Sequence, residues 1–295
     1  MIQKSLRYDN DVILEKFIKA KALEGCSENT LQHYERECKY FIKFINKNLI
    51  DVETRDIINY ISYQKEKGNS AVTLNNKRGV LNSLYQWFTK EGYLLLDPLK
   101  TIKKIRSPKK IKEHYTPREV ETLRDAVYNS NSKKQIFLRN IAIFEVLLSS
   151  GIRASELCNL NISDVNLNEC KMLINGKGNK QRIAYFNHKA QIAIENYLEV
   201  RDDDIEVLFA SERKKDGSRL KIGSLDNIIR KIGESVNIDA HPHKFRHTFA
   251  TDLLEKGMPL EQVKVALGHE NIRTTQIYAK TSQKDIEMNH RRLIE

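Results

Sequence analysis

Residues 241–247 read His-Pro-His-Lys-Phe-Arg-His and precede an apolar run, Phe249 to Leu254, that predicts a helix. Proline suits the first helical position, where its missing N–H breaks no hydrogen bond, so we expect the helix to begin at Pro242. His243 then lies in the first turn, where free N–H groups and the helix dipole favour an anion such as phosphate and a neutral imidazole. Arg246 follows three residues later on the same face. The stretch therefore predicts an anion site at a helix start.

Zinc is the competing interpretation of these histidines, because His243 and His247 are four residues apart and share a helical face. The stretch lacks the glutamate of the metalloprotease helix, and no pair of cysteines stands at ligand spacing. We expect no metal and no cofactor. Four isolated cysteines are interpreted as reduced packing residues: Cys26, Cys38, Cys158 and Cys170.

A glycine turn upstream carries an isolated arginine. Ile136 to Leu148 predicts an apolar helix that stops at Gly151, and a short helix follows from about Ala154 to Leu160. Arg153 lies between the two helices, where a rigidly held guanidinium can bind phosphate through two hydrogen bonds. Taken singly, the same pattern describes an ordinary surface arginine.

A β-hairpin is predicted between these two regions. Lys171 to Asn175 and Arg182 to Phe186 alternate apolar and polar residues around Gly176-Lys177-Gly178-Asn179. The loop lacks the spacing of a nucleotide-binding loop and does not precede a helix, so ATP binding is not expected. Lys177 and Lys180 are interpreted as DNA-directed lysines of the hairpin, with an ordinary solvated loop as the alternative.

The first hundred residues predict four helices that form a bundle. Ser27 and Ser70 suit helix N-caps, and Gly25, Gly68 and Gly92 suit helix ends. The second helix carries its apolar residues at spacings of three or four along one stripe: Leu31, Tyr34, Cys38, Phe41, Ile42 and Ile45.

A basic segment separates this bundle from the rest of the chain. Asp97-Pro98 breaks the helical pattern, and Thr116-Pro117 opens a new helix. We expect a helical domain over residues 1–106, a basic linker over 107–115 and a second domain over 116–295. A solvated surface is one interpretation of the basic residues near the linker. The other is contact with DNA, for which the candidates are Lys103, Lys104 and Lys109.

The overall charge points to a polyanionic partner. The chain has 295 residues, with 50 Lys and Arg against 39 Asp and Glu, for a net charge of +11. Nucleic acid is favoured over an anionic membrane surface. No apolar run approaches the ~18 residues of a membrane span, and Met1 to Asn10 lacks the apolar core of a secretory signal. We therefore expect a cytoplasmic protein without membrane contact.

Together with Leu267-Gly268-His269, these segments resemble the catalytic signature of the tyrosine recombinases, the phage-integrase and Xer-type enzymes. The family pattern is an arginine in G-x-R-x-S-E, a lysine in a G-K-G hairpin, H-x-x-R at a helix start, L-G-H, and a tyrosine nine residues after that histidine. The pattern falls, in the family's order, on Arg153, Lys177, His243, Arg246, His269 and Tyr278, with Ser155 and Glu156 also matching.

The resemblance covers the whole chain, because Ser27-Glu28-Asn29-Thr30 resembles the opening of the family's helical core-binding domain. It implies a mainly α fold with a small antiparallel sheet: an N-terminal helical bundle and a mixed α/β catalytic domain that clamp DNA in a C shape. It also implies site-specific recombination through a 3′-phosphotyrosyl intermediate and a Holliday junction. Integration with excision, inversion and resolution share this chemistry and remain open.

Roles for the matched residues follow from the same resemblance. Tyr278 would attack a DNA phosphate and release a 5′-hydroxyl. Arg153 and Arg246 would neutralise the pentavalent transition state, and Glu156 would support them. Lys177 would protonate the leaving 5′-oxygen as general acid, and His243 would help to move the proton from Tyr278. His269 would donate a further hydrogen bond to the phosphate.

The implied partner is double-stranded DNA with inverted-repeat half-sites. A homotetramer would assemble on two duplexes, from a monomer or weak oligomer in the free state. The tail after Tyr278 carries Ile286 and Leu293 seven residues apart, which predicts either a helix with a narrow apolar stripe or a frayed terminus. The family resemblance implies the first, with the tail docked on a neighbouring protomer. Two other functions are considered: a type IB topoisomerase, which uses the same chemistry, and a catalytically silent DNA-binding regulator.

Overall fold

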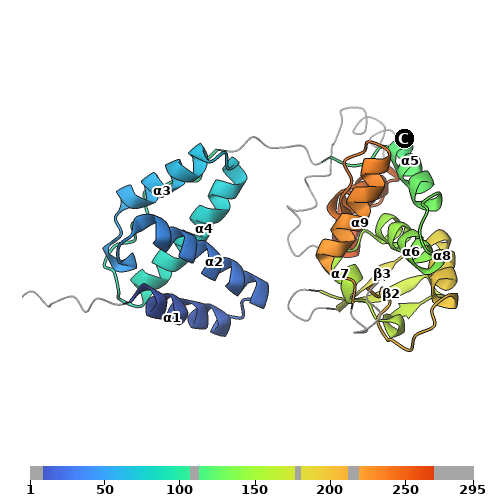
Figure 1. Ribbon diagram of the computed structural model, residues 1–295, viewed down its shortest axis with the longest axis horizontal. Coiled ribbons are helices and arrows are strands. Elements are labelled where there is room, and N and C mark those ends of the chain that lie inside the picture. Colours follow the sequence, from blue (N-terminus) through green and yellow to red (C-terminus); the bar gives the residue numbers. More distant parts are fainter. Residues whose placement is uncertain (1–8, 107–112, 177–180, 212–218, 269–295) are drawn as a thin grey trace, which may run out of the picture. The chain divides into compact units, whose positions relative to one another are not determined.

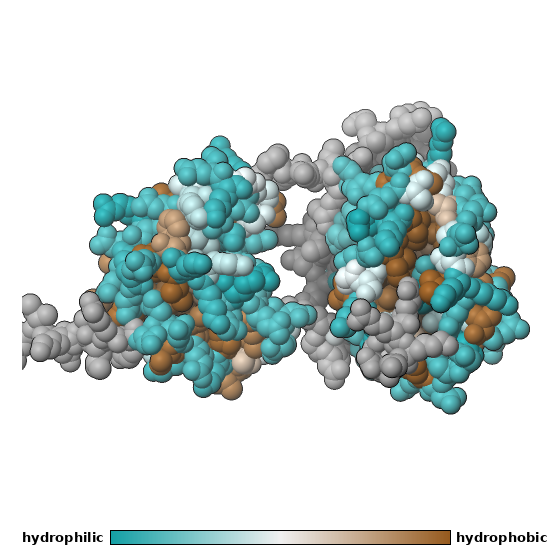
Figure 2. Space-filling view, viewed as in Figure 1, coloured by the Kyte–Doolittle hydropathy of each residue, from teal (hydrophilic) through white to brown (hydrophobic). Residues whose placement is uncertain are grey.

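The computed structural model describes residues 9–106, 113–176, 181–211 and 219–268 (Figure 1). The chain divides into two units, Met1–Lys109 and Lys110–Glu295. Figure 2 shows that the visible surface of each unit is mainly hydrophilic, with smaller hydrophobic areas among the hydrophilic residues. The domain limits 1–106 and 116–295 remain predictions.

The described part of the first unit, residues 9–106, consists of four helices and one short 3₁₀ turn. The elements are α1 (Asn10–Leu23), α2 (Glu28–Ile45), η1 (Leu49–Asp51), α3 (Thr54–Glu66) and α4 (Ala71–Lys90). Ser27 and Ser70 cap α2 and α4 by accepting hydrogen bonds from backbone N–H groups one turn later. Helices α1, α3 and α4 each end two residues before a glycine, at Gly25, Gly68 and Gly92. The predicted four-helix bundle is confirmed.

Several aromatic rings meet in the core of this unit. The rings of Phe41 and Tyr60 meet edge to face with centroids 5.0 Å apart. Tyr85 donates a hydrogen bond from its hydroxyl to the carbonyl of Leu49 at 3.1 Å, which satisfies its polar group inside the core. Burial raises the pKa of Tyr85 well above its ordinary value. The apolar stripes of the helices therefore meet in one core around these rings.

The second unit is also mainly helical. Its helices are α5 (Pro117–Tyr128), α6 (Lys134–Ser150), α7 (Ala154–Asn159), α8 (His188–Glu199), α9 (Ile222–Ser235), α10 (Pro242–Glu255) and α11 (Leu260–Leu267). Helix α6 is buried along most of its length and packs against α5, α8 and α10. Phe144 of α6 meets Phe245 of α10 edge to face, with ring centroids 5.3 Å apart. Helix α10 is thus fixed against the core, and begins at Pro242 as predicted.

A small antiparallel sheet completes the second unit. Its order is β1 (Val165–Asn166), β2 (Lys171–Asn175) and β3 (Gln181–Tyr185). The predicted hairpin is confirmed, although β3 begins and ends one residue earlier than expected, because Gln181 pairs with Asn175. Two residues are too few to give β1 an alternating pattern, so the sequence did not reveal it. The fold class, mainly α with a small antiparallel sheet, is confirmed.

The cysteines of the two cores are free thiols. Cys38 and Cys158 are buried, and burial raises the pKa of Cys38 to about 12 and that of Cys158 to about 11. A protonated, buried thiol acts as a small apolar side chain, so packing is the role of both residues. Within the described ranges, no helix is long and apolar enough to span a membrane.

Candidate active site

The turn between α6 and α7 positions Arg153. Gly151 ends α6 in the left-handed conformation with φ +59°, and a Cβ atom there would lie 2.3 Å from the ring of Phe249. Glycine is therefore required at this point on two counts, backbone conformation and space. Arg153 follows as the N-cap residue of α7, with 40% of its side chain exposed.

Glu156 is a buried carboxylate that binds two arginines. It accepts hydrogen bonds from the backbone N–H and the Nη1 of Arg153, both at 2.8 Å, and is 6% exposed. Nη1 and Nη2 of Arg182, on β3, donate to its two oxygens at 2.9 and 2.8 Å. Burial favours the neutral acid, but the hydrogen bonds from Arg182 and Arg153 outweigh it and lower the pKa of Glu156 to about 2. Glu156 is therefore ionised at neutral pH.

Arg246 is the most deeply buried of these arginines, at 2% exposure. Its Nη1 donates to the carbonyl of Gly151 at 2.8 Å, and its Nη2 donates to the carbonyl of Leu267 at 2.6 Å. Both acceptors are uncharged peptide groups at helix ends. These two hydrogen bonds fix the guanidinium of Arg246 between the end of α6 and the end of α11.

The structure brings Arg153 and Arg246 together at the end of α11. Nη2 of Arg153 donates to the carbonyl of Gly268 at 3.2 Å, one residue beyond the carbonyl that binds Arg246. The two guanidinium groups therefore bind consecutive peptide carbonyls at the end of α11. His269 is the next residue along the chain.

His243 lies exposed in the first turn of α10, at the position that the sequence predicted. The ring of His247, one turn later, packs against it at a centroid distance of 4.3 Å. His241 caps the helix, since its Nδ1 accepts the backbone N–H of Lys244 at 3.2 Å. This helix start presents an imidazole to solvent within a few residues of the buried Arg246.

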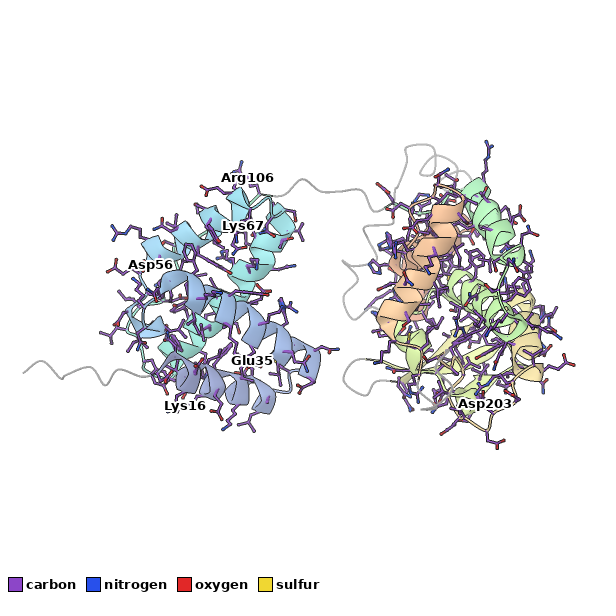
Figure 3. The ribbon with its side chains drawn as sticks, viewed as in Figure 1. Lys16, Glu35, Asp56, Lys67, Arg106 and Asp203 are labelled. Atoms are coloured by element: carbon purple, nitrogen blue, oxygen red, sulfur yellow. The ribbon has the colours of Figure 1, made fainter. Side chains whose placement is uncertain are left out.

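Several predicted site residues lie outside the described residues. They are Lys177, His269 and Tyr278 of the catalytic set, and Lys109 and Lys180 of the DNA-contacting set. Lys103 and Lys104 are exposed near the end of the described part of the first unit. Figure 3 labels Arg106, the last described residue before the gap at 107–112.

Arg182 is the site residue that sequence reasoning missed. The residue stands opposite Ile174 in the sheet and shares its strand face with buried Ala184. An arginine on the apolar face of a strand is unusual, because a buried charge needs a partner. This break in the alternation was the available signal, and its partner is Glu156.

The geometry offers anion-binding groups. In the described part of the chain, no group of three or more His, Cys, Asp or Glu side chains could hold a metal ion. Two arginines held on rigid supports suit a phosphate and can stabilise negative charge that develops on it.

Comparison with known proteins identifies the family. Residues 113–285 match the phage integrase family, and residues 13–93 match the N-terminal SAM-like domain of phage integrases. The chain belongs to the phage integrase family of tyrosine recombinases. It is 32% identical over 278 residues to tyrosine recombinase XerA of Pyrococcus horikoshii, covering 94% of this chain and 92% of that protein. It is 31% identical over 291 residues to tyrosine recombinase XerD of Halalkalibacterium halodurans, covering 92% of this chain and 95% of that protein.

Solved structures agree with this family. A crystal structure of XerA recombinase matches with a TM-score of 0.52 at 26% identity, over 96% of this chain and 98% of that one. The Tn1549 transposon integrase in complex with a circular intermediate DNA matches in fold, with a TM-score of 0.76 at 19% identity, over 95% of this chain and 99% of that one. The predicted enzyme class, a site-specific tyrosine recombinase, is confirmed, and the topoisomerase and regulator alternatives are not favoured.

Proposed function

We propose that this recombinase cuts and rejoins specific DNA sites through Tyr278, with Arg153 and Arg246 binding the scissile phosphate. The observation that supports this most is the pair of hydrogen bonds from these arginines to consecutive carbonyls, those of Leu267 and Gly268. Rigid supports matter because the transition state gains negative charge on the phosphate, and fixed positive groups stabilise it without reorganising.

The proposed cleavage step is an in-line displacement at phosphorus. The phenol oxygen of Tyr278 forms a bond to phosphorus while the bond to the 5′-oxygen breaks, which leaves a 3′-phosphotyrosyl link. A phenol with a pKa of about 10 is a poor nucleophile at neutral pH, so His243 assists removal of its proton. Lys177 protonates the leaving 5′-oxygen, and His269 donates a hydrogen bond to the phosphate. The phosphodiester energy is conserved, so neither ATP nor a cofactor is consumed.

Rejoining reverses this step with a different strand. The 5′-hydroxyl of the partner duplex attacks the phosphotyrosyl bond and releases Tyr278. Exchange of one pair of strands gives a Holliday junction, and exchange of the second pair completes recombination. Integration with excision, inversion and resolution are all built from these steps.

The proposed assembly is a homotetramer on two duplexes, each with two inverted half-sites. The net charge of +11 supports DNA as the partner, and exposed Lys103 and Lys104, with Lys109 and Lys180, are the proposed phosphate contacts. Each protomer would close its two domains around one half-site. We propose that the reaction takes place in the cytoplasm, in line with the DNA-acting recombinases to which the chain is similar.

A groove in the second unit supports exchange of the C-terminal tail between protomers. The groove has a volume of about 620 Å³, and apolar side chains of β3, α10 and α11 line it, among them Ile183, Leu253 and Val265. The tail offers Ile286 and Leu293 at the spacing of one helical stripe. We propose that the tail of one protomer docks in the groove of the next and so links the four active sites.

A nicked DNA substrate tests this function. The preferred site is first selected from a library of random duplexes. A nick beside the scissile phosphate then lets the short fragment with the free 5′-hydroxyl dissociate, so that the covalent adduct accumulates. Wild-type protein is expected to form an adduct stable in denaturant, whereas Tyr278→Phe binds the same DNA and forms none. An adduct from Tyr278→Phe would refute the assignment. Rapid relaxation of a supercoiled plasmid without the site would instead indicate a topoisomerase.

A further inference from the structure

Arg182 contacts both groups that bind the guanidinium of Arg153, the carboxylate of Glu156 and the peptide at Gly268. Its side chain is 14% exposed and lies on the face of β3 that also carries buried Ala184. A charge at such a position costs stability unless a partner compensates for it. The identity of its contacts therefore shows what the charge is for.

The first contact is Glu156. Both terminal nitrogens of Arg182 donate to the two carboxylate oxygens, which is the strongest geometry for this kind of pair. The same carboxylate binds the backbone and the guanidinium of Arg153. Arg182 thus determines where the carboxylate sits, and the carboxylate determines where Arg153 sits.

The second contact is the end of α11. A Cβ atom on Gly268 would lie 2.8 Å from both Cδ and Nε of Arg182, so the side chain passes directly against this glycine. The carbonyl of Gly268 is the acceptor for Nη2 of Arg153. Arg182 therefore packs on the peptide that holds the other side of the Arg153 guanidinium.

We propose that Arg182 is a positioning residue for the recombination reaction: it fixes Glu156 and Gly268, which together orient Arg153 against the scissile phosphate. This inference depends on the proposed role of Arg153. Arg182 acts through these neighbours, since both of its terminal nitrogens bind Glu156. A displacement of a reacting group by about 1 Å can cost about 100-fold in rate, so loss of this support has a measurable effect.

Arg182→Met tests the proposal, because methionine keeps an apolar stem and removes the charge and the hydrogen bonds. We expect single-turnover cleavage at saturating DNA to slow by about 10- to 100-fold, with half-site affinity changed by less than about threefold. Arg182→Lys, which keeps the charge but not the paired geometry, should lie between Arg182→Met and wild type. If Arg182→Met does not fold, Arg182→Lys carries the same measurements.

Arg124→Met is a matched control. Arg124 on α5 is also 14% exposed, and it donates at 2.7 Å to a buried carboxylate, that of Glu145 on α6. Neither residue binds Arg153. We expect Arg124→Met to lower stability without slowing cleavage at saturating DNA. A similar slowing in both variants would show that loss of any buried ion pair slows the reaction, and would overturn the proposal.

A neutral substrate separates positioning from folding and DNA binding. A methylphosphonate at the scissile position carries no charge, so the reaction depends less on a correctly placed guanidinium. Arg182→Met and Arg153→Ala should both lose less rate on this substrate than on the ordinary phosphate. Equal slowing on both substrates for Arg182→Met, with preferential recovery for Arg153→Ala, would overturn this inference alone. No preferential recovery for Arg153→Ala would overturn the proposed role of Arg153 itself.

A double-mutant cycle tests the route of action. Arg182→Met combined with Glu156→Gln should be no more than about threefold slower than the slower single variant, because both changes remove one support. Multiplication of the two effects would show that Arg182 acts independently of Glu156. A fall in DNA affinity and in its salt dependence, with normal cleavage at saturation, would make Arg182 a DNA contact instead.

Discussion

Glu156→Gln should destabilise the second unit by an amount that the structure allows us to work out. The pKa of Glu156 falls from 4.5 to about 2, because hydrogen bonds from Arg182 and Arg153 overcome the effect of burial. At about 1.36 kcal/mol per pKa unit, the ionised carboxylate contributes about 3 kcal/mol to stability at neutral pH. Glutamine is uncharged and turns an amide donor toward the donors of the arginines, so most of this contribution is lost.

The single tryptophan provides an internal control for this measurement. Trp87 is buried in the first unit, so its fluorescence follows that unit, whereas far-ultraviolet circular dichroism follows both. In urea unfolding of the full chain, Glu156→Gln should lower the stability of the second unit by about 3 kcal/mol and leave the Trp87 transition unchanged. A loss below about 1 kcal/mol would contradict the reasoning from the buried ion pair.

The pH dependence gives the sign of the effect. A lowered pKa means that the unfolded chain binds more protons between pH 4.5 and 2, so this stabilisation is complete above pH 4.5 and is lost as pH falls toward 2. The difference between wild type and Glu156→Gln should shrink by about 1.4 kcal/mol between pH 7 and pH 3.5, since other groups cancel in the comparison. A difference that stays constant over this range would show that Glu156 is not held ionised by its arginines.

Three further predictions concern the reaction on DNA. Lys177→Ala should slow cleavage of ordinary DNA far more than cleavage of a 5′-phosphorothiolate, because sulfur leaves without a proton; equal slowing would make Lys177 a DNA contact only. Neutralising Lys103, Lys104 and Lys109 together should weaken the salt dependence of half-site affinity, by about 0.9 in the log–log slope for each lost phosphate contact. Sequence preference should not change, because phosphate contacts do not read the bases. A slope equal to that of wild type would show that these lysines do not contact DNA. Truncation after Lys284 should leave half-site binding intact in a gel-shift assay but impair synapsis and strand exchange in a recombination assay. Strand exchange at the full-length rate would favour a frayed terminus.

Local signals in the sequence predicted much of the fold. Ser27 and Ser70 cap their helices, and Pro242 begins α10, because each residue type satisfies or avoids backbone N–H groups within its own helix turn. The two-residue strand β1 has no such signal, since two residues are too few to show an alternating pattern, although its partners in β2 lie only five to seven residues away. The capping rules succeeded because each cap leaves its signal within one helix turn.

The groups of the site also divide into those with a local sequence signal and those that only the packing of the fold identifies. Arg153 and Arg246 could be found from motifs, and in the structure both donate to carbonyls at the end of α11. Their acceptors, the carbonyls of Leu267 and Gly268, could not be found, because any residue has a carbonyl and only the packing of α11 brings these two to the arginines. Arg182 left a sequence signal, an arginine on the apolar face of its strand, but its role became visible only when its pairing with Glu156 was known.

The identity of the residue bonded to DNA is the most direct test of the account. The adduct formed on a nicked substrate would be digested with protease and nuclease, and the modified peptide sequenced by mass spectrometry. We predict a 3′-phosphate ester on the phenol oxygen of Tyr278. A phosphate on any other residue, or cleavage that yields only free DNA ends, would contradict it.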